Sequence, residues 1–390
     1  MTASEKIPFW RDTRILNLLG QIFVILVLVG ILIFLGNNLI INFQRLRLNF
    51  GFEFIFDTRR PAGFNIGNSP IPYQPTDPVI IALLVGLINS LRVMISGIIL
   101  AAILGIMVGL GRLSSNWLVR QIATVYVEIF RNTPLLLQLF FWYSAVFLKF
   151  PKIDNPLILF NSILLSNRGM AIPWPSGKLQ TWLSLILLFI NAILAFLVWR
   201  TRTQRRIQQG ESGNRFLVIL SGIGITSLLA LMIGLDWQKP LLNIELGRIE
   251  QGLILSPEFA SLLIGLTVYT AAFIAEVVRA GIQSVNQGQW EAAKALGLKP
   301  SLVMQLVIFP QALRVMIPPL TSEFLNLAKN SSLASATLYK DIFAVSYTVA
   351  EKTGRAVEMM LVVMSTYLII NLIISSGMNT FNHLVQLKER

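Results

Sequence analysis

Long apolar runs separated by short polar segments make up most of the chain. At about 20 residues or more, each run can cross the hydrocarbon core of a bilayer as a helix. Eight runs can be drawn, at about 15–36, 79–111, 121–149, 180–199, 216–235, 257–281, 313–335 and 357–379. The pattern predicts an all-α, polytopic membrane protein with about eight transmembrane helices, which form a single domain over residues 1–390.

The third run, 121–149, is longer than one crossing needs. Within it, Thr133 and Pro134 have the order typical of a helix start, a capping hydroxyl followed by a residue with no amide hydrogen. This order predicts that the crossing begins at Pro134 and that residues 117–131 lie at the membrane surface. A continuous helix with a kink also fits the pattern.

Three segments between the runs, 37–78, 150–179 and 236–256, are long enough to carry some structure of their own. The first two are rich in Pro, Gly and Asn, which favours loops over folded domains.

Small residues recur every four positions in the second run. Gly97, Ala101, Gly105 and Gly109 form one ridge, which would let another helix approach closely. We expect this ridge to pack within the chain, because such spacing is common in membrane helices.

Composition agrees with a membrane protein and excludes several kinds of chemistry. Hydrophobic residues make up 54% of the chain and charged residues 13%. With no Cys and one His, the chain cannot form disulfides, thiolate metal sites or a His-Glu-x-x-His zinc site. His383 is expected to be a solvated residue of the C-terminal tail. No cofactor is therefore expected in this chain.

The net charge of +13 is spread over the polar segments and is not concentrated in one domain. This distribution argues against nucleic acid as a partner and favours contact with the lipid bilayer. The first run follows Lys6 and Arg11, but it is too long for a signal peptide and lacks a small-residue cleavage site. An even number of spans and the basic segment 200–215 predict that both termini are cytoplasmic.

The polar segment 282–312 interrupts the apolar pattern. Strong helix formers occupy 289–296, and Gly297 stands where a left-handed residue would end the helix. A second helix is expected to restart near Pro300 and to be interrupted at Pro310. From the local pattern alone, an amphipathic connector and a docking element are equally good interpretations.

This segment resembles the EAA loop of ATP-binding cassette importer permeases. The similarity rests on EAAKALG followed, thirteen residues after Gly297, by the proline of VIFP, with Phe309 where the pattern usually has Leu. The blocks YVEIFRNTPLLLQLFFWY, AEVVRAGIQSVNQGQWEAAKALG and PPLTSEFLNLAKNSSL are similar to the polar amino acid branch of these permeases. RRPAGFNIGNSPIPYQP and SNRGMAIP resemble the larger permease of general L-amino-acid uptake systems.

The resemblance implies a bacterial inner-membrane permease that imports polar L-amino acids. Its type I importer core of five helices would occupy about 79–149 and 257–385, with extra spans at 15–36, 180–199 and 216–235. A second, different permease, a dimer of ABC ATPases and a periplasmic amino acid binding protein would be its partners. ATP and Mg would bind to the ATPase subunits, since this chain has no Gly-x-x-x-x-Gly-Lys-Ser/Thr phosphate loop.

The same resemblance assigns coupling to the ATPase to the 282–312 loop. The residues that would dock are Trp290, Glu291, Ala292, Ala293, Lys294 and Gly297.

Charged and polar residues within or beside the runs are candidates for the substrate pathway or its gate. They are Glu128, Arg131, Glu323, Lys329, Asn330, Ser331 and Ser332. Lys329 should lie well inside the membrane, where a charge is costly unless it faces a polar interior or a partner. It could bind a substrate carboxylate, or it could form a structural ion pair with Glu128 or with the other permease. Glu276 and Arg279 can pair as i and i+3, and an interfacial anchor is the preferred interpretation.

Two other classes of protein remain as alternatives. A secondary amino acid transporter or channel would also be polytopic, but the sequence lacks the inverted repeats typical of secondary transporters. A membrane enzyme would need a nucleophile, an acid and base pair or a metal site, which the composition makes improbable.

Overall fold

The computed structural model describes residues 13–45, 50–67, 69–209, 214–243 and 248–385. Its helical elements are α1 (Thr13–Arg45), α2 (Glu53–Phe56), α3 (Val79–Arg112), α4 (Trp117–Asn132), α5 (Leu135–Phe140), η2 (Phe141–Val146), η3 (Phe147–Lys149), α6 (Leu179–Gln209), α7 (Asn214–Leu229), η4 (Ala230–Gly234), α8 (Pro257–Gln283), α9 (Gln287–Ala295), α10 (Pro300–Val303), η5 (Met304–Ile308), α11 (Phe309–Asn330), η6 (Ser331–Thr337), α12 (Ile342–Thr353) and α13 (Ala356–Val385). Its strands are β1 (Leu157–Leu159), β2 (Ile163–Ser166), β3 (Gly169–Ile172), β4 (Trp174–Pro175), β5 (Trp237–Gln238), β6 (Leu241–Asn243), β7 (Arg248–Glu250) and β8 (Leu253–Leu255).

The predicted polytopic helical fold is confirmed. In the described part of the chain, seven helices are long and apolar enough to cross a membrane, and Leu135–Lys149 is a shorter apolar helix. Each of the eight predicted runs therefore coincides with helical structure. Lys6 and Arg11, which entered the prediction of orientation, lie outside the described residues, and His383 lies in the last turn of α13.

The break predicted in the third run lies at the expected position, but its local cause differs. Helix α4 ends at Asn132 and α5 begins after Pro134, whose backbone is extended. The Thr133 hydroxyl does not cap α5, because it donates a 2.8 Å hydrogen bond back to the carbonyl of Ile129. Instead the Gln138 amide closes the break by donating to the carbonyls of Phe130 and Thr133, at 2.9 and 3.0 Å.

The loop prediction for 150–179 was wrong, since this segment, together with 236–256, contributes strands to small antiparallel sheets. The other segment predicted as a loop, 37–78, contains the end of α1 and the short helix α2. The larger sheet has the order β1-β2-β3-β8, and β4-β5 and β6-β7 form two-stranded sheets. Aliphatic residues of the two segments with strands supply a core of their own, in which Leu164, Ala171 and Ile249 are buried. Strand β8 leads through Ser256, whose hydroxyl caps α8, directly into the central helix.

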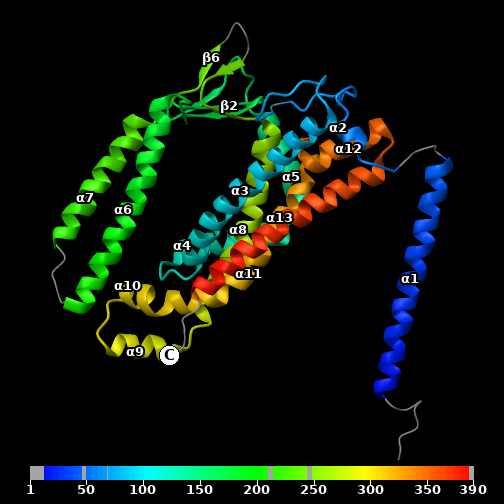
Figure 1. The fold of residues 1–390 in the computed structure, drawn as a ribbon. Coiled ribbons are helices and arrows are strands. Elements are labelled where there is room, and N and C mark those ends of the chain that lie inside the picture. Colours follow the sequence, from blue (N-terminus) through cyan, green and yellow to red (C-terminus); the bar gives the residue numbers. More distant parts are fainter. Residues whose placement is uncertain (1–12, 46–49, 68, 210–213, 244–247, 386–390) are drawn as a thin grey trace, which may run out of the picture.

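The helical core lies between this sheet and α9 (Figure 1). We call its two ends the sheet end and the α9 end. Helices α3 and α8 run in parallel from the sheet end to the α9 end, and α11 returns in the opposite direction against α8 and α13. Helix α12 packs against α3 and α13 at the sheet end.

The small-residue ridge of α3 packs within the chain, as predicted. Ala101 is fully buried. A β-carbon added at Gly105 would lie 2.6 Å from Cβ of Ile274, and one at Gly109 would lie 2.8 Å from Cβ of Val278. Glycine is therefore needed at both positions for the backbones of α3 and α8 to approach this closely.

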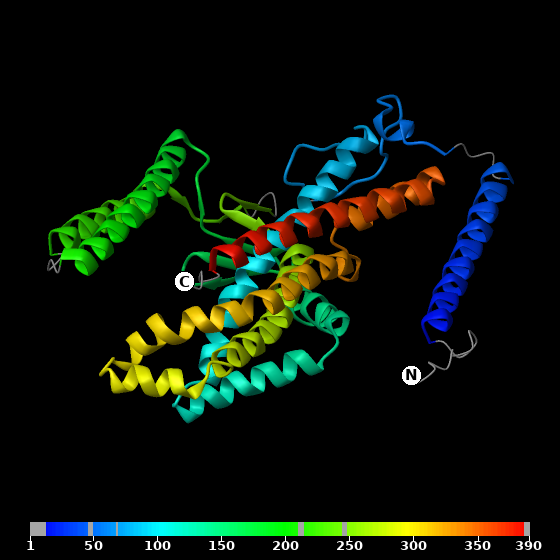
Figure 2. The same ribbon diagram turned by 60° about the horizontal axis from the view of Figure 1, so that its bottom comes forward.

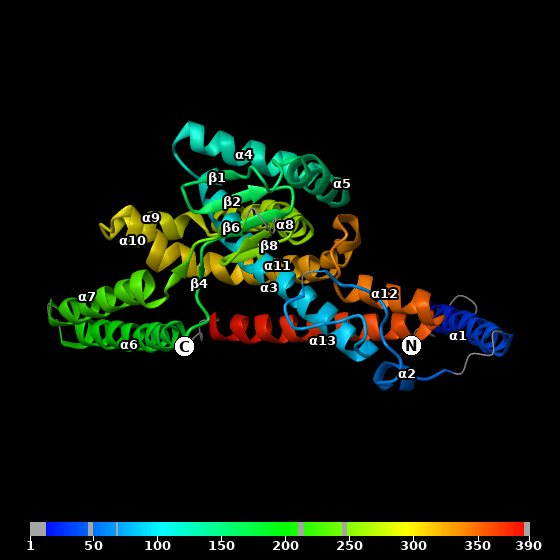
Figure 3. The same ribbon diagram turned by 90° about the horizontal axis from the view of Figure 1, so that it is seen from above.

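Two parts stand apart from the core. Helices α6 and α7 form a hairpin that joins the core through the sheets, and α1 lies on the opposite side (Figures 1 and 3). Inside the hairpin, the Asn191 amide donates to the hydroxyls of Thr226 and Ser227, both at 3.0 Å. At its sheet end, hydrogen bonds from Lys178 and Ser176 keep the pKa of Asp236 below its ordinary value.

Figure 2 shows that α1 lies beside the core without packing against its helices. Most of its side chains are exposed and apolar, so lipid or another subunit must cover them in the membrane.

The α3–α8 packing yields the first prediction. Gly105→Ala should lower the midpoint of thermal unfolding of the purified complex in detergent, because the added methyl group collides with a β-branched side chain that cannot move away. Overpacking of this kind costs about 1–3 kcal/mol. Gly377→Ala in α13 is the matched control, since nothing lies within 4 Å of a β-carbon there. Equal unfolding midpoints for the two variants would contradict the close packing.

Candidate functional site

The polar segment 282–312 folds into a short helix that turns back on the core at the α9 end. Asn286 starts α9 by accepting a 2.8 Å hydrogen bond from the amide of Gly288. Gly297 ends it with a φ of +70°, as the sequence predicts, and its amide donates to the carbonyl of Lys294 at 2.9 Å. A left-handed residue here suits glycine, because other residues pay a steric penalty.

The predicted docking residues do not all face the same way. Ala293 is buried and packs with Val303, Ile308 and Ala312, so it anchors α9 to its own chain. Trp290 is half-buried against the same cluster. Glu291, Ala292, Lys294 and Gly297 are exposed, and these residues form the free face of α9.

The helix after Gly297 differs from the prediction. Pro310 does not interrupt it, since helical structure continues from Pro300 to Thr337. The π-helical segment η5 precedes the proline. Its altered hydrogen-bond pattern accommodates a residue that has no amide hydrogen to donate. Helix α9 thus rests on the base of a helical segment that reaches the sheet end.

A carboxylate surrounded by guanidinium groups ties three helices together near the α9 end. Glu276 of α8 forms ion pairs with Arg112 at the end of α3 and with Arg279 one turn further along α8. The guanidinium of Arg131, from the end of α4, lies 4.0 Å from the same carboxylate and over the ring of Phe273. The predicted Glu276–Arg279 pair is therefore confirmed as part of a larger, net positive cluster.

The candidate pathway residues differ in the contacts that they make within the chain. Arg131 attracts the carboxylate of Glu323 in α11 electrostatically, but the two form no ion pair in the described structure. Glu128 is exposed and accepts a hydrogen bond from Asn132 at 3.0 Å. Among the described residues Lys329 forms no ion pair, so a pair with Glu128 is not present within the chain.

At the junction of α11 and η6, some polar side chains bond to the backbone of their own helix and others are exposed. The buried Ser331 hydroxyl donates to the carbonyl of Ala328 at 2.8 Å, and the Ser332 hydroxyl donates to that of Lys329 at 2.7 Å. Lys329 itself is exposed on α11, and Asn330 is half-buried.

The sequence analysis missed a polar junction at the sheet end. Asp341 is 1% exposed, caps α12 through the amide of Ala344 and accepts a hydrogen bond from the Tyr367 hydroxyl at 3.1 Å. The Ser90 hydroxyl of α3 accepts from the amide of Ile342 at 3.0 Å. These bonds join α3, α12 and α13. An Asp directly before an apolar segment is the signal of a helix cap that could have revealed Asp341.

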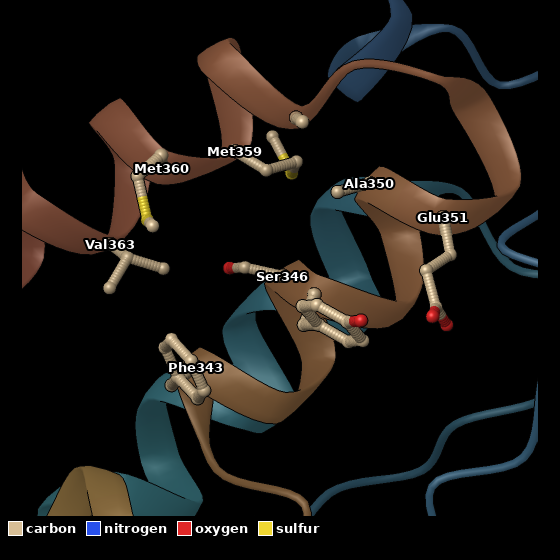
Figure 4. A pocket seen from close by; sticks show the side chains of 9 residues that line it. Phe343, Ser346, Ala350, Glu351, Met359, Met360 and Val363 are labelled. Carbon is tan, nitrogen blue, oxygen red and sulfur yellow. The ribbon is translucent and has the colours of Figure 1, made fainter.

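An apolar hollow of about 330 Å³ lies between α12 and α13 (Figure 4). Phe343, Met359, Met360 and Val363 line it, the Ser346 hydroxyl points into it, and Glu351 lies at its edge. This lining suits an acyl chain or an apolar side chain better than a charged solute. Among the described residues no three His, Asp or Glu side chains gather into a possible metal site.

Comparison with known proteins places the chain in a family. The family described as "Binding-protein-dependent transport system inner membrane component" matches residues 101–386. The general L-amino acid transport system permease protein AapQ of Rhizobium johnstonii is 40% identical over 386 residues, which cover 97% of this chain and 94% of AapQ. The putative amino-acid ABC transporter permease protein YhdX of Escherichia coli is 41% identical, over 95% of this chain and 94% of YhdX.

A third relative is the glutamate/glutamine/aspartate/asparagine transport system permease protein BztB of Rhodobacter capsulatus. It is 40% identical over 97% of this chain and 96% of its own length. A solved structure described as an amino acid ABC transporter with histidines superposes with a TM-score of 0.47 and 20% identity, over 78% of this chain and 94% of the other. The family match and the nearly full-length identities show that this chain belongs to the inner membrane components, or permeases, of binding-protein-dependent ABC transport systems.

Proposed function

We propose that this permease forms part of the translocation pathway of an importer for polar L-amino acids in a bacterial inner membrane. The names of its relatives support this substrate class, since three proteins at about 40% identity are described as amino acid permeases, one of them for glutamate, glutamine, aspartate and asparagine. The chain matches them along 94–96% of their own lengths. Both termini and α9 would be cytoplasmic, and the sheets would face the periplasm.

The free face of α9 is the observation that carries the coupling role. It exposes opposite charges on Glu291 and Lys294 at the end of the core, while the buried Ala293 fixes the helix to the segment that continues into α11. A partner that docks on this face can therefore push on the core. We assign this partner to a dimer of ABC ATPases, which binds ATP and Mg and performs the hydrolysis.

Two further partners follow from the proposal. A periplasmic amino acid binding protein would dock at the sheet end, where residues 50–67 and 69–78 and the sheets lie on the same end of the core (Figures 1 and 3). A second, different permease would complete the pathway. Its presence is supported by the resemblance of the two insertions to the larger of two unequal permeases and by the exposed apolar faces of the core.

Gly297 provides the test of coupling. Gly297→Val should leave the complex assembled but reduce ATPase stimulation by the liganded binding protein about tenfold, because a β-branched residue is strongly disfavoured at φ +70° and would tilt α9. Gly297→Asn is the matched control, since Asn tolerates the left-handed conformation and should retain most of the stimulation. The charge reversal Glu291→Lys should also uncouple the complex. Full stimulation and uptake in both Gly297→Val and Glu291→Lys would refute the assignment.

The composition of the complex is a separate prediction. Native mass spectrometry of the complex purified through a tag on this 43.6 kDa chain should show one copy of it, one different permease and two ATPase subunits. Copurification of an ATPase also distinguishes an importer permease from a secondary transporter or channel. Two copies of this chain without a second permease would contradict the heteromeric arrangement.

Substitution of Lys329 tests whether this residue lines the substrate pathway. Because it is exposed and has no ion pair within the described chain, its removal should not destabilise this subunit. Lys329→Met should reduce uptake about tenfold with the complex intact, since a charge-assisted hydrogen bond to a substrate carboxylate is lost. Lys329→Arg, which keeps the charge, should retain more activity. Loss of the second permease on purification of Lys329→Met would instead identify an ion pair between subunits, and unchanged uptake and assembly would exclude both roles.

A further inference from the structure

A pocket of about 340 Å³ with a mixed polar and apolar lining opens at the sheet end of the core. Four separate parts of the chain line it: residues 65–67, Asn89 of α3, the start of α8 and the corner between η6 and α12. We call it the sheet-end pocket. A volume near the lower limit for small-molecule sites suits a compact solute and is too small for a folded peptide.

The pocket presents one charge of each sign. Glu258, in the first turn of α8, and Lys340, at the η6–α12 corner, both line it and are both partly exposed. Within the part of the chain that the structure describes, neither side chain forms an ion pair. Two opposite charges that share a small pocket without pairing are suited to a ligand that itself carries both signs.

Asn89 adds an unpartnered polar atom. Its side chain is 1% exposed, and its amide nitrogen donates a 2.9 Å hydrogen bond to the carbonyl of Lys340, which fixes the corner to α3. Its amide oxygen has no hydrogen-bond partner among the described residues. A buried acceptor without a donor is costly, and this cost adds to the strain of the corner that borders the pocket.

The corner itself holds backbone strain. Leu338 lines the pocket with a φ of +60°, a left-handed conformation that leucine rarely adopts, and its side chain is 66% exposed. Strained residues cluster at sites where the surrounding structure fixes a conformation for function. Here the hydrogen bonds of Asn89, Ser90 and Asp341 hold the corner in place.

We propose that the sheet-end pocket binds the zwitterionic head of a free α-amino acid. The ammonium of Lys340 pairs with the ligand's carboxylate, and the carboxylate of Glu258 receives its ammonium. Because the pocket binds the carboxylate and the ammonium that all α-amino acids share, it accepts amino acids with several different side chains. This inference rests on the proposed function and adds the residues that recognise the substrate where it meets the core.

The first test is binding of tritiated L-glutamine to the complete complex in nanodiscs, in the absence of the binding protein. Lys340→Met and Glu258→Gln should each weaken binding about tenfold, as expected for the loss of one charge-assisted contact. Lys152→Met and Glu53→Gln are matched controls, because both residues are exposed and lie outside the pocket, and their affinities should equal that of the wild type.

The second test separates direct contact from a change in folding. Binding of glutamine α-methyl ester, which lacks the carboxylate, and of N-acetylglutamine, which lacks the ammonium, is measured by competition. Lys340→Met should abolish the wild type's preference for glutamine over the ester but keep its preference over the N-acetyl compound. Glu258→Gln should show the reverse. A merely structural defect would weaken all three ligands equally.

The outcomes also separate this inference from the proposed function. If the wild-type complex imports glutamine, but it binds none without the binding protein or the two variants keep both preferences, the pocket assignment is overturned. If the wild-type complex, reconstituted with its binding protein, imports no amino acid at all, the proposed function fails first.

Discussion

Close packing of α3 against α8 is the contact on which the other features depend. The two helices run side by side for most of their lengths because Gly105 and Gly109 leave room for Ile274 and Val278. In a bilayer, where apolar surface gains little by leaving lipid, such close contact is a principal source of attraction between helices. The contact also fixes the relative height of both helices. It thereby brings Arg112 level with Glu276 at the α9 end, and Asn89 beside the start of α8 at the sheet end.

Two groups of charges lie at opposite ends of the core, where they perform different tasks. At the α9 end, Glu276 is shared by Arg112, Arg279 and Arg131, so the helix ends are held together by a fully engaged carboxylate. At the sheet end, Glu258 and Lys340 line one pocket without pairing in the described structure. Satisfied charges contribute to architecture, whereas unsatisfied ones are available to a ligand.

The sequence predicted all eight helical runs through their length and apolarity, which are strong constraints in lipid. It also located the break before Pro134 and the left-handed Gly297, since proline and glycine act through the backbone of their own residue. It failed for the sheets and for the sheet-end pocket, which depend on contacts between residues far apart in the sequence. Ala171 pairs with Ile254, and Asn89 bonds to Lys340. No local pattern specifies such pairs. Pro310 was misjudged because the π-helical turn η5 before it lets the helix continue through the proline, and the local pattern did not reveal this turn.

The two proposed sites lie at opposite ends of one helical segment. Pro300–Thr337 begins beside α9, carries Glu323, and ends at the strained corner of Leu338, which lines the sheet-end pocket. At about 1.5 Å per residue, 38 helical residues extend about 57 Å, which is more than the thickness of a bilayer. A helix transmits displacement along its axis, and the π-helical turn η5 and the adjacent prolines 318 and 319 are the points where it can bend. A push on α9 therefore has a direct mechanical connection to the corner that carries Lys340, with no need for a chain of side-chain contacts.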